Sequence, residues 1–351
     1  MRVLVTGGAG FIGSALCRHL VRQRGASILN VDALTYAAAP GTLADLEEDA
    51  RYRFAKADIR DASAIAALIA EFRPDAICNA AAESHVDRSI SAPGDFMDTN
   101  VNGVFVMLQA ARAYWETLPP PERDAFRFIQ VSTDEVFGSA APGARFTEET
   151  PYDPSSPYSA SKAAGDHLAR AWGRTYGLPV IITNCSNNYG PFQFPEKLIP
   201  LTLLNALNGA DIPIYGDGGN VRDWLYVDDH ARGIADALVK GKPGESYLFG
   251  GEAERRNIEV AHAICDVLDT MNRPNEPRRA LIKHVADRPG HDRRYAVDPS
   301  KAKRDLGWPP SLSFEEGLRR TIDWYAANEA WGRPLQRRYD GRRLGLLQPA
   351  S

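Results

Sequence analysis

The feature that most constrains the fold is an alternation of short apolar runs with segments of helical periodicity. The runs VLVTG (3–7), SILNVD (27–32) and DAICNAA (75–81) are separated by the helical patterns FIGSALCRHLVRQ (11–23) and ASAIAALIAEF (62–72). Parallel strands need long crossover connections, because each connection must return the chain to the same edge of the sheet. The alternation therefore predicts an α/β fold with a doubly wound parallel sheet.

The alternation continues to about residue 184. A helical pattern near residues 100–115 precedes the apolar run FRFIQVS (126–132), and a helix expected from about Ser159 precedes the run PVIITN (179–184). Each segment has the length and periodicity of an ordinary strand or helix.

Beyond residue 184 the composition changes: a stretch rich in proline and aromatic residues, NNYGPFQFPEKLIP, is followed by shorter elements. With 351 residues, 44% of them hydrophobic, the chain can form two lobes with real cores. We predict a first domain over 1–184 and a smaller α/β substrate lobe over 185–335, from which the segment near 221–240 returns to the first domain. A peripheral tail is expected over 336–351, and PPPERDAF (119–126) is expected to be a surface loop.

Composition argues against several classes of protein. The net charge is −4 with both signs interspersed and no long basic block, so nucleic acid is not an expected partner. No run approaches the roughly 18 apolar residues of a membrane span, and MRVLVTGGAG enters a strand directly, so we expect a cytoplasmic protein with no membrane partner. The four cysteines form no CxxC pair and the seven histidines no HExxH motif, so we expect buried cysteines and no metal site.

A glycine-rich turn, VLVTGGAGFIG, links the first predicted strand to the first helix. Gly7, Gly10 and Gly13 would permit a tight turn and let backbone amides approach a pyrophosphate, which is favoured at a helix N-terminus. An ordinary turn is the alternative. However, Asp32 ends the next strand, where a carboxylate can accept hydrogen bonds from a ribose diol and repel a 2′-phosphate. The pattern therefore predicts a Rossmann-type domain that binds NAD rather than NADP.

The segment AKADIRD follows the third predicted strand. Asp58 and Ile59 in this segment fit a contact to the edge of the adenine. The alternative for Asp58 is that it caps the helix that follows, because aspartate is a common N-cap residue.

Tyr158 and Lys162 stand four residues apart in YSASKAAGDHLARAW, at the start of a predicted helix. This spacing places both side chains on one face. An ammonium beside a phenol would lower the phenol pKa from about 10 and make Tyr158 a usable base. A surface Tyr and Lys on an amphipathic helix is the alternative, but the nearby glycine motif favours a catalytic pair.

Two adjacent carboxylates follow the apolar run FRFIQV. The heptapeptide STDEVFG places Thr133, Asp134 and Glu135 where a strand leaves the core. Because two neighbouring carboxylates repel each other and need water, a solvated turn is one interpretation. The other is a site that both gives and takes a proton, since close carboxylates do not readily both ionise and their pKa values split.

The motifs VTGGAGFIG and YSASK together resemble the extended short-chain dehydrogenase/reductase family. More narrowly, AAESHVDRSI (81–90), STDEVFG, NNYGPFQFPEKLIP, RDWLYVDDH (222–230) and ADRPGHDRRY (286–295) together resemble the dTDP-glucose 4,6-dehydratases. The similarity runs from the first residue to about residue 330. It implies a lyase that retains an NAD cofactor, which is used and regenerated in each turnover.

The resemblance implies a role for each residue of the proposed catalytic set. Tyr158, on the same helix face as Lys162, would take the proton from the sugar 4-hydroxyl while hydride leaves carbon 4 for NAD, with Thr133 hydrogen-bonded to the same oxygen. Glu135 would then remove the proton on carbon 5, and Asp134, kept protonated, would protonate the departing 6-hydroxyl. Hydride would return to carbon 6 and give dTDP-4-keto-6-deoxy-glucose, for rhamnose or another deoxysugar. A 4-epimerase would not need the carboxylate pair.

The resemblance also implies binding residues. Arg222 and Arg288 suit a pyrophosphate because a guanidinium presents a fork of donors, although arginines are mostly surface residues. Tyr215 would either stack on the base or pack in the core. The residues implied for NAD are Gly7, Gly10, Phe11, Ile12, Gly13, Asp32, Ala33, Leu34, Thr35, Asp58, Ile59, Ala80, Ala81, Ala82, Glu83, Ser84, Thr99, Tyr158, Lys162 and Asn188. The residues implied for the nucleotide sugar are Ser84, Thr133, Asn187, Glu196, Lys197, Leu198, Pro213, Tyr215, Arg222, Asn257, Arg288 and His291.

The chain departs from the family pattern in two places. Phe137 stands where the dehydratases usually have a tyrosine, and TYAAAPGTLADL after Asp32 differs from their usual segment, which puts fine contacts to the adenosine in doubt. The alternatives are a UDP- or GDP-sugar 4,6-dehydratase, a 4-epimerase, or a non-catalytic NAD-binding sensor, which would be expected to lose Tyr158 and Lys162. Family resemblance further implies a homodimer through the helices near 100–115 and 159–175.

Overall fold

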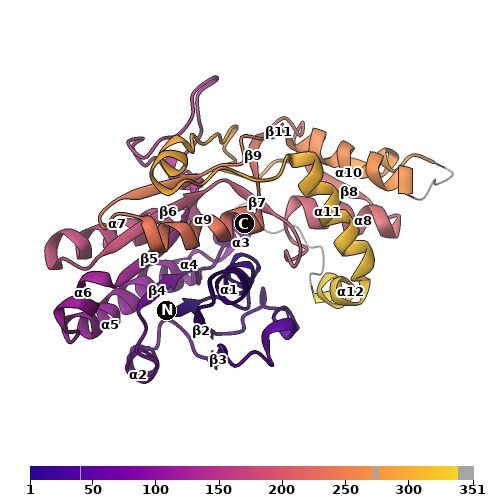
Figure 1. Cartoon of the computed structure of the whole chain (residues 1–351). Helices are drawn as coiled ribbons and strands as arrows, with labels where there is room; N and C mark the ends of the chain where they lie inside the picture. The colour runs from indigo at the N-terminus through magenta and orange to yellow at the C-terminus, as the bar shows by residue number, and fades with distance from the viewer. Residues whose placement is uncertain (40, 272–275, 339–351) are drawn as a thin grey trace, which may run out of the picture.

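A seven-stranded sheet forms the centre of the larger lobe (Figure 1). The structure is a computed structural model, and it describes residues 1–39, 41–271 and 276–338. All pairings in this sheet are parallel, in the order β10-β6-β5-β4-β1-β2-β3. The predicted doubly wound α/β class is confirmed, and ligands of such sheets bind at the carboxyl ends of the strands where the strand order reverses, here between β1 and β4. The strands are β1 (Arg2–Thr6), β2 (Ser27–Asp32), β3 (Tyr52–Lys56), β4 (Ala76–Asn79), β5 (Arg127–Thr133), β6 (Val180–Cys185) and β10 (Ser246–Phe249).

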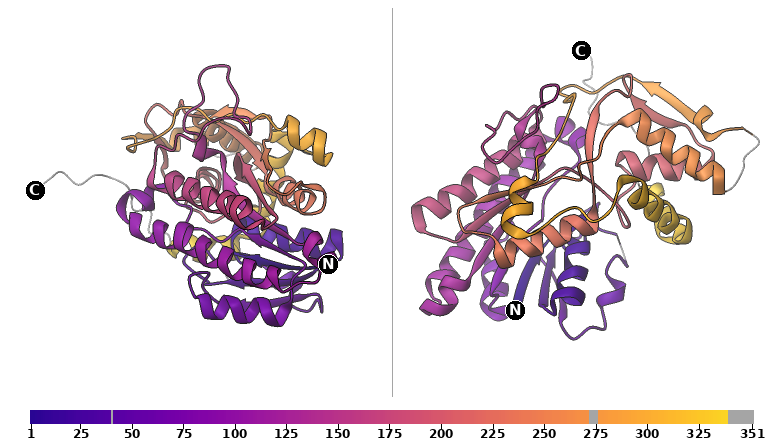
Figure 2. Two further views of the ribbon diagram at one scale, coloured as in Figure 1. Left: turned by 90° about the vertical axis from the view of Figure 1, so that its left-hand side faces the viewer. Right: turned by 45° about the horizontal axis from the view of Figure 1, so that its top comes forward.

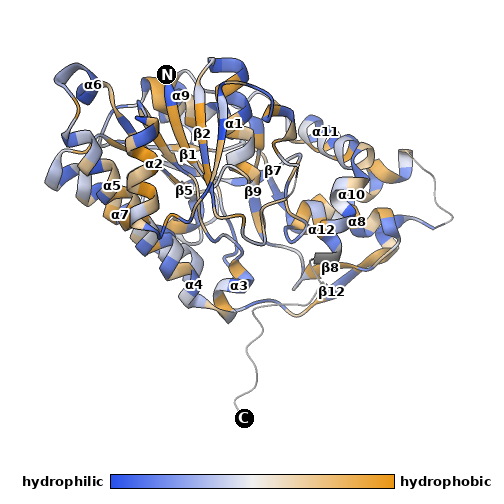
Figure 3. Ribbon diagram, turned by 90° about the horizontal axis from the view of Figure 1, so that it is seen from below, coloured by the Kyte–Doolittle hydropathy of each residue, from blue (hydrophilic) through white to orange (hydrophobic). Residues whose placement is uncertain are grey.

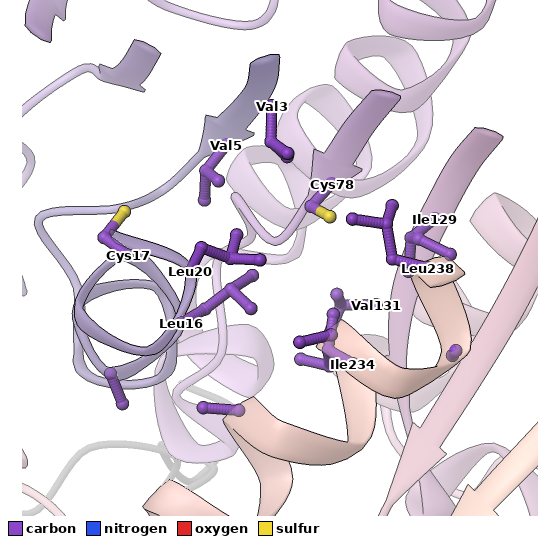
Figure 4. Close-up of a cluster of buried hydrophobic side chains, with 14 of the residues drawn as sticks. Val3, Val5, Leu16, Cys17, Leu20, Cys78, Ile129, Val131, Ile234 and Leu238 are labelled. Carbon is purple, nitrogen blue, oxygen red and sulfur yellow. The ribbon is translucent and has the colours of Figure 1, made fainter. Parts of the chain in front are cut away.

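Helices cover both faces of this sheet, and Figure 3 shows its apolar strands between them. On one face, Leu16 and Leu20 of α1 and Leu238 of α9 pack with Val5 and other strand residues (Figure 4). On the other face, α2, α5 and α7 form a second buried cluster with the strands. The helices and single turns of this lobe are α1 (Phe11–Arg24), η1 (Ala44–Leu46), α2 (Ala62–Phe72), α3 (Val86–Ser91), α4 (Pro93–Met97), η2 (Asp98–Gly103), α5 (Val104–Glu116), α6 (Pro120–Ala125), η3 (Asp134–Phe137), α7 (Pro157–Tyr176) and α9 (Val227–Lys240).

The smaller lobe contains a three-stranded sheet, β11-β9-β7, and a parallel pair, β12-β8. Its buried core combines these strands with α8, α10 and α11. In the right-hand view of Figure 2 most of its orange and yellow helices lie at the right, away from the purple helices at the left. Its elements are β7 (Asn187–Tyr189), α8 (Leu198–Asn208), β8 (Ile212–Tyr215), β9 (Val221–Tyr226), β11 (Glu254–Arg256), α10 (Asn257–Met271), η4 (Arg278–Leu281), β12 (Ile282–Val285), α11 (Phe314–Ala327) and α12 (Glu329–Arg338). The turn η5 (Ala302–Leu306) instead packs in the cluster of α1 and α9.

The chain does not divide into two lobes at a single point. After β9, helix α9 packs in the same cluster as α1, and β10 pairs with β6 at the edge of the seven-stranded sheet. Of the segment near 221–240 that was expected to return to the first domain, α9 packs there and Val221–Tyr226 forms β9 of the smaller sheet, so this expectation stays a prediction. The limits 1–184 and 185–335 stay predictions.

One local expectation was wrong. PPPERDAF contains a helix, α6, rather than only loop, because proline is well tolerated in the first turn of a helix, where its missing N–H is not needed. The peripheral tail expected over 336–351 stays a prediction: its first residues belong to α12, whose Leu335 is only 2% exposed and packs with Phe194. The remainder of that tail, 339–351, lies outside the described residues.

Other sequence-based expectations concern single residue types. The four cysteines, Cys17, Cys78, Cys185 and Cys265, are buried as expected. Among the described residues, no group of three or more His, Cys, Asp or Glu side chains is arranged to hold a metal ion. No helix in the described part of the chain has both the length and the apolar character needed to cross a membrane.

Candidate active site

Two adjoining cavities lie between the lobes. The first, about 510 Å³, follows the carboxyl ends of the central strands, and the second, about 730 Å³, extends into the smaller lobe. Both include the Glu135 side chain in their walls. A ligand in one cavity would therefore meet a ligand in the other beside Glu135. The two walls share Glu135, Asn187, Asn188, Gln193, Glu196 and Lys197.

The glycine turn forms one end of the first cavity. Gly7 has φ +70°, and a Cβ there would lie 2.7 Å from the Ala81 Cα; a Cβ on Gly13 would lie 2.1 Å from the Gly7 carbonyl oxygen. Only glycine permits this close approach. Gly10 is the N-cap of α1 and supplies no side-chain cap, so the first amides of the helix can receive an anion. The cradle therefore fits the pyrophosphate of a dinucleotide.

Asp32 lies at the end of β2, in the wall of the same cavity. Its Oδ2 accepts a hydrogen bond from the Ala9 N–H at 2.9 Å and its Oδ1 accepts one from the Leu34 N–H at 2.7 Å. Burial raises the pKa of Asp32, and the two backbone donors act in the opposite direction. Each carboxylate oxygen has a further lone pair for a ribose hydroxyl.

All but one of the residues predicted for the cofactor line the first cavity. The exception, Leu34, is 45% exposed and contributes its backbone N–H to Asp32 instead. Asp58 lines the cavity but does not cap α2: that cap is Asp61, which accepts hydrogen bonds from two amides of the first turn. The guanidinium of Arg60 donates to the Asp58 carboxylate and holds its pKa below the usual value.

Asp134 occupies a buried position immediately after β5. Asp134 is only 1% exposed, and its Oδ2 has no hydrogen-bond partner among the described residues. Burial raises the pKa of Asp134 well above its usual value, and the charges of Glu135 and Asp223 raise it further. The alternative of a solvated turn does not fit Asp134, because the protein encloses this residue almost completely at the wall of the first cavity. The environment favours the protonated form, which is the form of an acid.

Glu135 has a different environment, although it is the next residue. It is half-buried and faces both cavities. Burial raises the pKa of Glu135, but the positive charges of Arg288, Lys197 and Arg222 act in the opposite direction. Cationic neighbours favour the carboxylate. The two adjacent side chains therefore have distinct electrostatic surroundings, as an acid and a base require.

Thr133 fixes the turn that presents both carboxyl groups. It is the N-cap of η3, and its Oγ1 accepts a hydrogen bond from the Glu135 N–H at 3.2 Å. The same hydroxyl lies 3.3 Å from Asp134 Oδ1 and also bonds to the side chain of Tyr158. Thr133 thus connects the carboxylate pair to the tyrosine.

Tyr158 and Lys162 lie on the first turns of α7, which starts with a capping box between Ser156 and Ser159. Both side chains line the first cavity. The Lys162 ammonium, however, donates to the Val131 carbonyl oxygen at 2.7 Å. Burial raises the pKa of Tyr158 well above its usual value, and the Glu135 charge adds to this effect. The expected lowering of the phenol pKa is therefore not produced by the protein alone, because loss of solvation dominates.

The second cavity is lined by long polar side chains that the fold holds in place. Arg288 binds Asp87 with an Nη1 to Oδ1 distance of 2.6 Å, and the Tyr215 hydroxyl donates to the other oxygen of Asp87 at 2.6 Å. Arg222 is only 5% exposed, so neither arginine is an ordinary surface residue. Tyr215 is half-buried in the cavity wall rather than packed in the core. Ser84 and Thr133 line the first cavity, and the other predicted sugar-nucleotide residues line the second: Asn187, Glu196, Lys197, Leu198, Pro213, Tyr215, Arg222, Asn257, Arg288 and His291.

The sequence did not identify several wall residues. Asp87 orients both Arg288 and Tyr215. The Arg222 guanidinium carbon lies over the Tyr295 ring, 4.1 Å from the ring centroid. Asp87 and Tyr295 belong to motifs that carry the family resemblance, but no local pattern distinguishes them from neighbours. His85 also lines the second cavity, and its Nδ1 lies 3.6 Å from Glu196 Oε2.

Comparisons with known proteins agree with this geometry. A family model described as GDP-mannose 4,6 dehydratase matches residues 4–321. A dTDP-glucose 4,6-dehydratase from Escherichia coli is 53% identical over 99% of this chain and 100% of its own length. A probable dTDP-glucose 4,6-dehydratase from Sinorhizobium fredii is 55% identical over 100% of both chains.

Solved structures of similar proteins share the whole fold. A dTDP-glucose 4,6-dehydratase from Streptomyces venezuelae, solved with NAD bound, is 46% identical, covers 95% of this chain and 100% of its own, and has a TM-score of 0.88. A UDP-glucose 4-epimerase from Thermus thermophilus, in complex with NAD, is 30% identical over 93% of this chain and 100% of its own, with a TM-score of 0.82. The chain belongs to the nucleotide-sugar 4,6-dehydratase family that the matching model describes and, within it, to the dTDP-glucose 4,6-dehydratases.

Proposed function

We infer that the protein is a lyase that converts dTDP-glucose to dTDP-4-keto-6-deoxy-glucose with NAD as a retained cofactor. The observation that carries this conclusion is the carboxylate pair at the junction of the two cavities. Asp134 is enclosed with an unpartnered oxygen, and Glu135 faces both cavities among three cationic side chains. Elimination of water needs one group to accept a proton and another to donate one, and the pair offers both.

The first cavity fits NAD through backbone and side-chain groups of this chain. The glycine turn and the N-terminus of α1 would receive the pyrophosphate, and Asp32 would bind the adenosine ribose. When bound, NAD supplies the acceptor and donor of hydride and a positive ring charge. That charge would favour the phenolate of Tyr158, which burial alone disfavours.

The residues around the junction would then act on a sugar placed between the cavities. Tyr158 would accept the proton of the 4-hydroxyl, with Thr133 holding the same oxygen. The resulting ketone acidifies carbon 5, from which Glu135 would remove a proton. Asp134 would protonate the 6-hydroxyl so that it leaves as water.

The second cavity would hold the nucleoside diphosphate. Arg222 and Arg288 line it and present guanidinium groups to a pyrophosphate, while Tyr215 offers a ring to the base. A thymine methyl contributes only about 1–3 kcal/mol of discrimination in an apolar pocket. A UDP- or GDP-sugar substrate is therefore the nearest alternative, and a 4-epimerase is less well supported because it would leave the carboxylate pair without a role.

We further propose that the protein works in the cytoplasm as a homodimer and binds neither nucleic acid nor membrane. Support for the dimer comes from α5 and α7, which carry exposed aromatic side chains. Phe105 is 43% exposed and packs edge-on against Trp172, with ring centroids 5.8 Å apart. Sedimentation of the purified protein would measure the state directly, and a monomer at micromolar concentration would contradict the proposal.

The reaction can be tested without mutation. Purified protein is incubated with dTDP-glucose and no added cofactor, beside UDP-glucose and GDP-mannose, and the products are examined by mass spectrometry. Loss of one water from the dTDP sugar alone is expected. A mass-neutral change at carbon 4 would indicate an epimerase, and an unchanged sugar with NAD added would contradict the proposed function.

The Glu135→Gln variant separates the chemical steps. Oxidation at carbon 4 should still occur, but carbon 5 should keep its proton, so reduced cofactor should accumulate on the enzyme and be detected by its absorbance. The matched variant Asp134→Asn should slow loss of water more than oxidation. Normal turnover of Glu135→Gln would remove Glu135 from the role of base.

A further inference from the structure

Lys162 is a buried cation whose hydrogen bonds alone do not explain how its charge is tolerated. The residue is 5% exposed, and its ammonium donates to the uncharged Val131 carbonyl. An isolated charge in a protein interior is costly unless a group of opposite sign lies nearby. Burial lowers the pKa of Lys162, and the charge of Asp166 is the largest influence in the opposite direction.

Asp166 lies one helical turn after Lys162, on the same face of α7. It is fully buried, and its Oδ2 accepts hydrogen bonds from the Ser132 hydroxyl at 2.6 Å and the Tyr152 hydroxyl at 2.9 Å. No described residue is hydrogen-bonded to its Oδ1. Asp166 touches neither cavity of the active site. Its carboxylate is therefore fixed behind the site, not in it.

The donors to Asp166 are themselves oriented. The Arg170 guanidinium donates to the Tyr152 oxygen at 2.9 Å and lies 4.7 Å from the centre of its ring. Because this oxygen accepts from Arg170, its own proton is directed to Asp166. Two hydroxyl donors and a cation two bonds away along the network stabilise the carboxylate form. Burial opposes this and raises the pKa of Asp166, while Lys162, Ser132, Tyr152 and Arg170 lower it.

We propose that Asp166 is a positioning residue for the dehydratase reaction: its buried carboxylate, held by Ser132 and Tyr152, is the counter-charge that keeps the Lys162 ammonium charged and in place in the cavity wall. This inference rests on the proposed function. Although both residues are described, no direct ion pair joins them, so Asp166 acts across the low-dielectric interior.

The other titratable groups that face this pair do not supply the same charge. The Cys185 thiol on β6 and, before NAD binds, the Tyr158 phenol on α7 are uncharged near neutral pH, because burial raises the pKa of both. Arg170 carries a positive charge and lies beyond Tyr152. Asp166 is thus the anionic group that the structure places behind Lys162.

The first test is a thermal-unfolding cycle that needs no substrate. Asp166→Asn and Lys162→Met are each expected to lower Tm, because each leaves one buried charge uncompensated. The double variant should recover part of the loss, with a Tm above that of at least one single variant. If Asp166→Asn alone does not fold, the double variant should still fold. The proposal would be overturned if the double variant lost at least as much Tm as the two single variants lose together.

The second test is the pH profile of kcat/KM. In Asp166→Asn the ammonium loses its counter-charge, so the alkaline limb should move to lower pH by about one unit or more; a purely structural role would lower the rate without moving the limb. The control is Asp236→Asn, which removes a buried carboxylate that pairs with Arg24 on the far side of the sheet. This variant should leave the alkaline limb of the profile in place. An unmoved limb in Asp166→Asn would contradict the proposal. Failure of the wild type to dehydrate dTDP-glucose would instead contradict the proposed function, and the unfolding cycle would still decide the role of Asp166.

Discussion

The two cavities have walls of different construction. The first is built largely from backbone and small side chains at the ends of the central strands, such as Gly7, Gly13 and Ala81, and a single added Cβ would collide with its own backbone. The second is built from long side chains of the smaller lobe, such as Arg222 and Arg288, held by ion pairs and hydrogen bonds.

Because the walls differ, the two cavities should respond to different kinds of substitution. A backbone cradle has no spare space, so it should fail through steric change and respond little to the loss of one charge. A side-chain network should tolerate small changes of volume and respond to the loss of a charge or hydrogen bond. The residues at the junction should affect the chemistry without preventing either ligand from binding.

The largest effect is expected at the junction. Tyr158→Phe removes the group that accepts the first proton, so kcat should fall by about 10²- to 10⁴-fold. The ring keeps its packing against Phe96, 6.3 Å between centroids, so bound NAD and the affinity for dTDP should change little. Steady-state kinetics, together with the NAD content of the purified variant, measure both. A variant with full activity would exclude Tyr158 as the base.

The second effect tests the backbone cradle. Gly13→Ala would place a Cβ 2.1 Å from the Gly7 carbonyl oxygen, so the turn must open and the purified protein should carry little or no NAD. Calorimetric titration should still detect dTDP in the second cavity. The control is Gly94→Ala on α4, where an added Cβ meets no atom within 4 Å, and its NAD content should match the wild type. Equal NAD content in Gly13→Ala would contradict the steric account.

The third effect tests the side-chain network. Arg288→Met removes one charged hydrogen-bond donor, worth about 1.5–3 kcal/mol, so the Kd for dTDP should rise by about 10- to 100-fold while NAD stays bound. Arg293→Met is the matched control, because Arg293 is exposed and pairs with Asp217 outside both cavities. An unchanged Kd in Arg288→Met would show that the second cavity holds its ligand by other groups.

The smallest effect concerns one histidine beside each cavity. Burial lowers the pKa of His85 and of His230 from 6.5 to about 3. Between these pH values the unfolded chain binds more protons than the folded one, so the free energy of unfolding falls as the pH drops, by up to about 1.4 kcal/mol per unit for each histidine. Denaturant unfolding at pH 7 and pH 5 measures this change. The free energy of unfolding should differ less between the two pH values in His85→Asn than in the wild type.

His230→Asn provides the comparison for the first cavity. His230 is hydrogen-bonded through Nδ1 to the Asn188 side chain at 3.0 Å, whereas His85 faces Glu196. Both variants should flatten the pH dependence of stability, but His230→Asn should also loosen Asn188 and release some NAD. Identical NAD content in the two variants would contradict a link between His230 and the first cavity.

The sequence was informative where function depends on neighbours along the chain. The glycine turn, Asp32, the heptapeptide around Glu135 and the Tyr158–Lys162 pair each lie within a short motif at a strand end or helix start, and parallel strands bring their carboxyl ends to one edge. The strand and helix pattern likewise predicted the sheet. Its error was local: α6 was expected as loop, because short polar helices have weak periodicity.

Where function depends on distant residues, the sequence was silent. Asp87 and Arg288 are 201 positions apart, and nothing in either segment indicates that they pair. Burial also reversed one expectation, because a lysine four residues from a tyrosine predicts a lowered phenol pKa, whereas the fold buries both groups and directs Lys162 to Val131.

The sequence by itself determined the sheet, the cofactor cradle and the identity of the acid and base candidates, because these follow from periodicity and from residues adjacent in the chain. Only the tertiary structure decided how those candidates are charged. It buried Asp134 and left its Oδ2 without a hydrogen-bond partner among the described residues, placed the cations of the smaller lobe beside Glu135, and set Asp166 behind Lys162. Protonation depends on solvation and on charges brought together from distant segments, and a linear sequence does not specify either until it is folded.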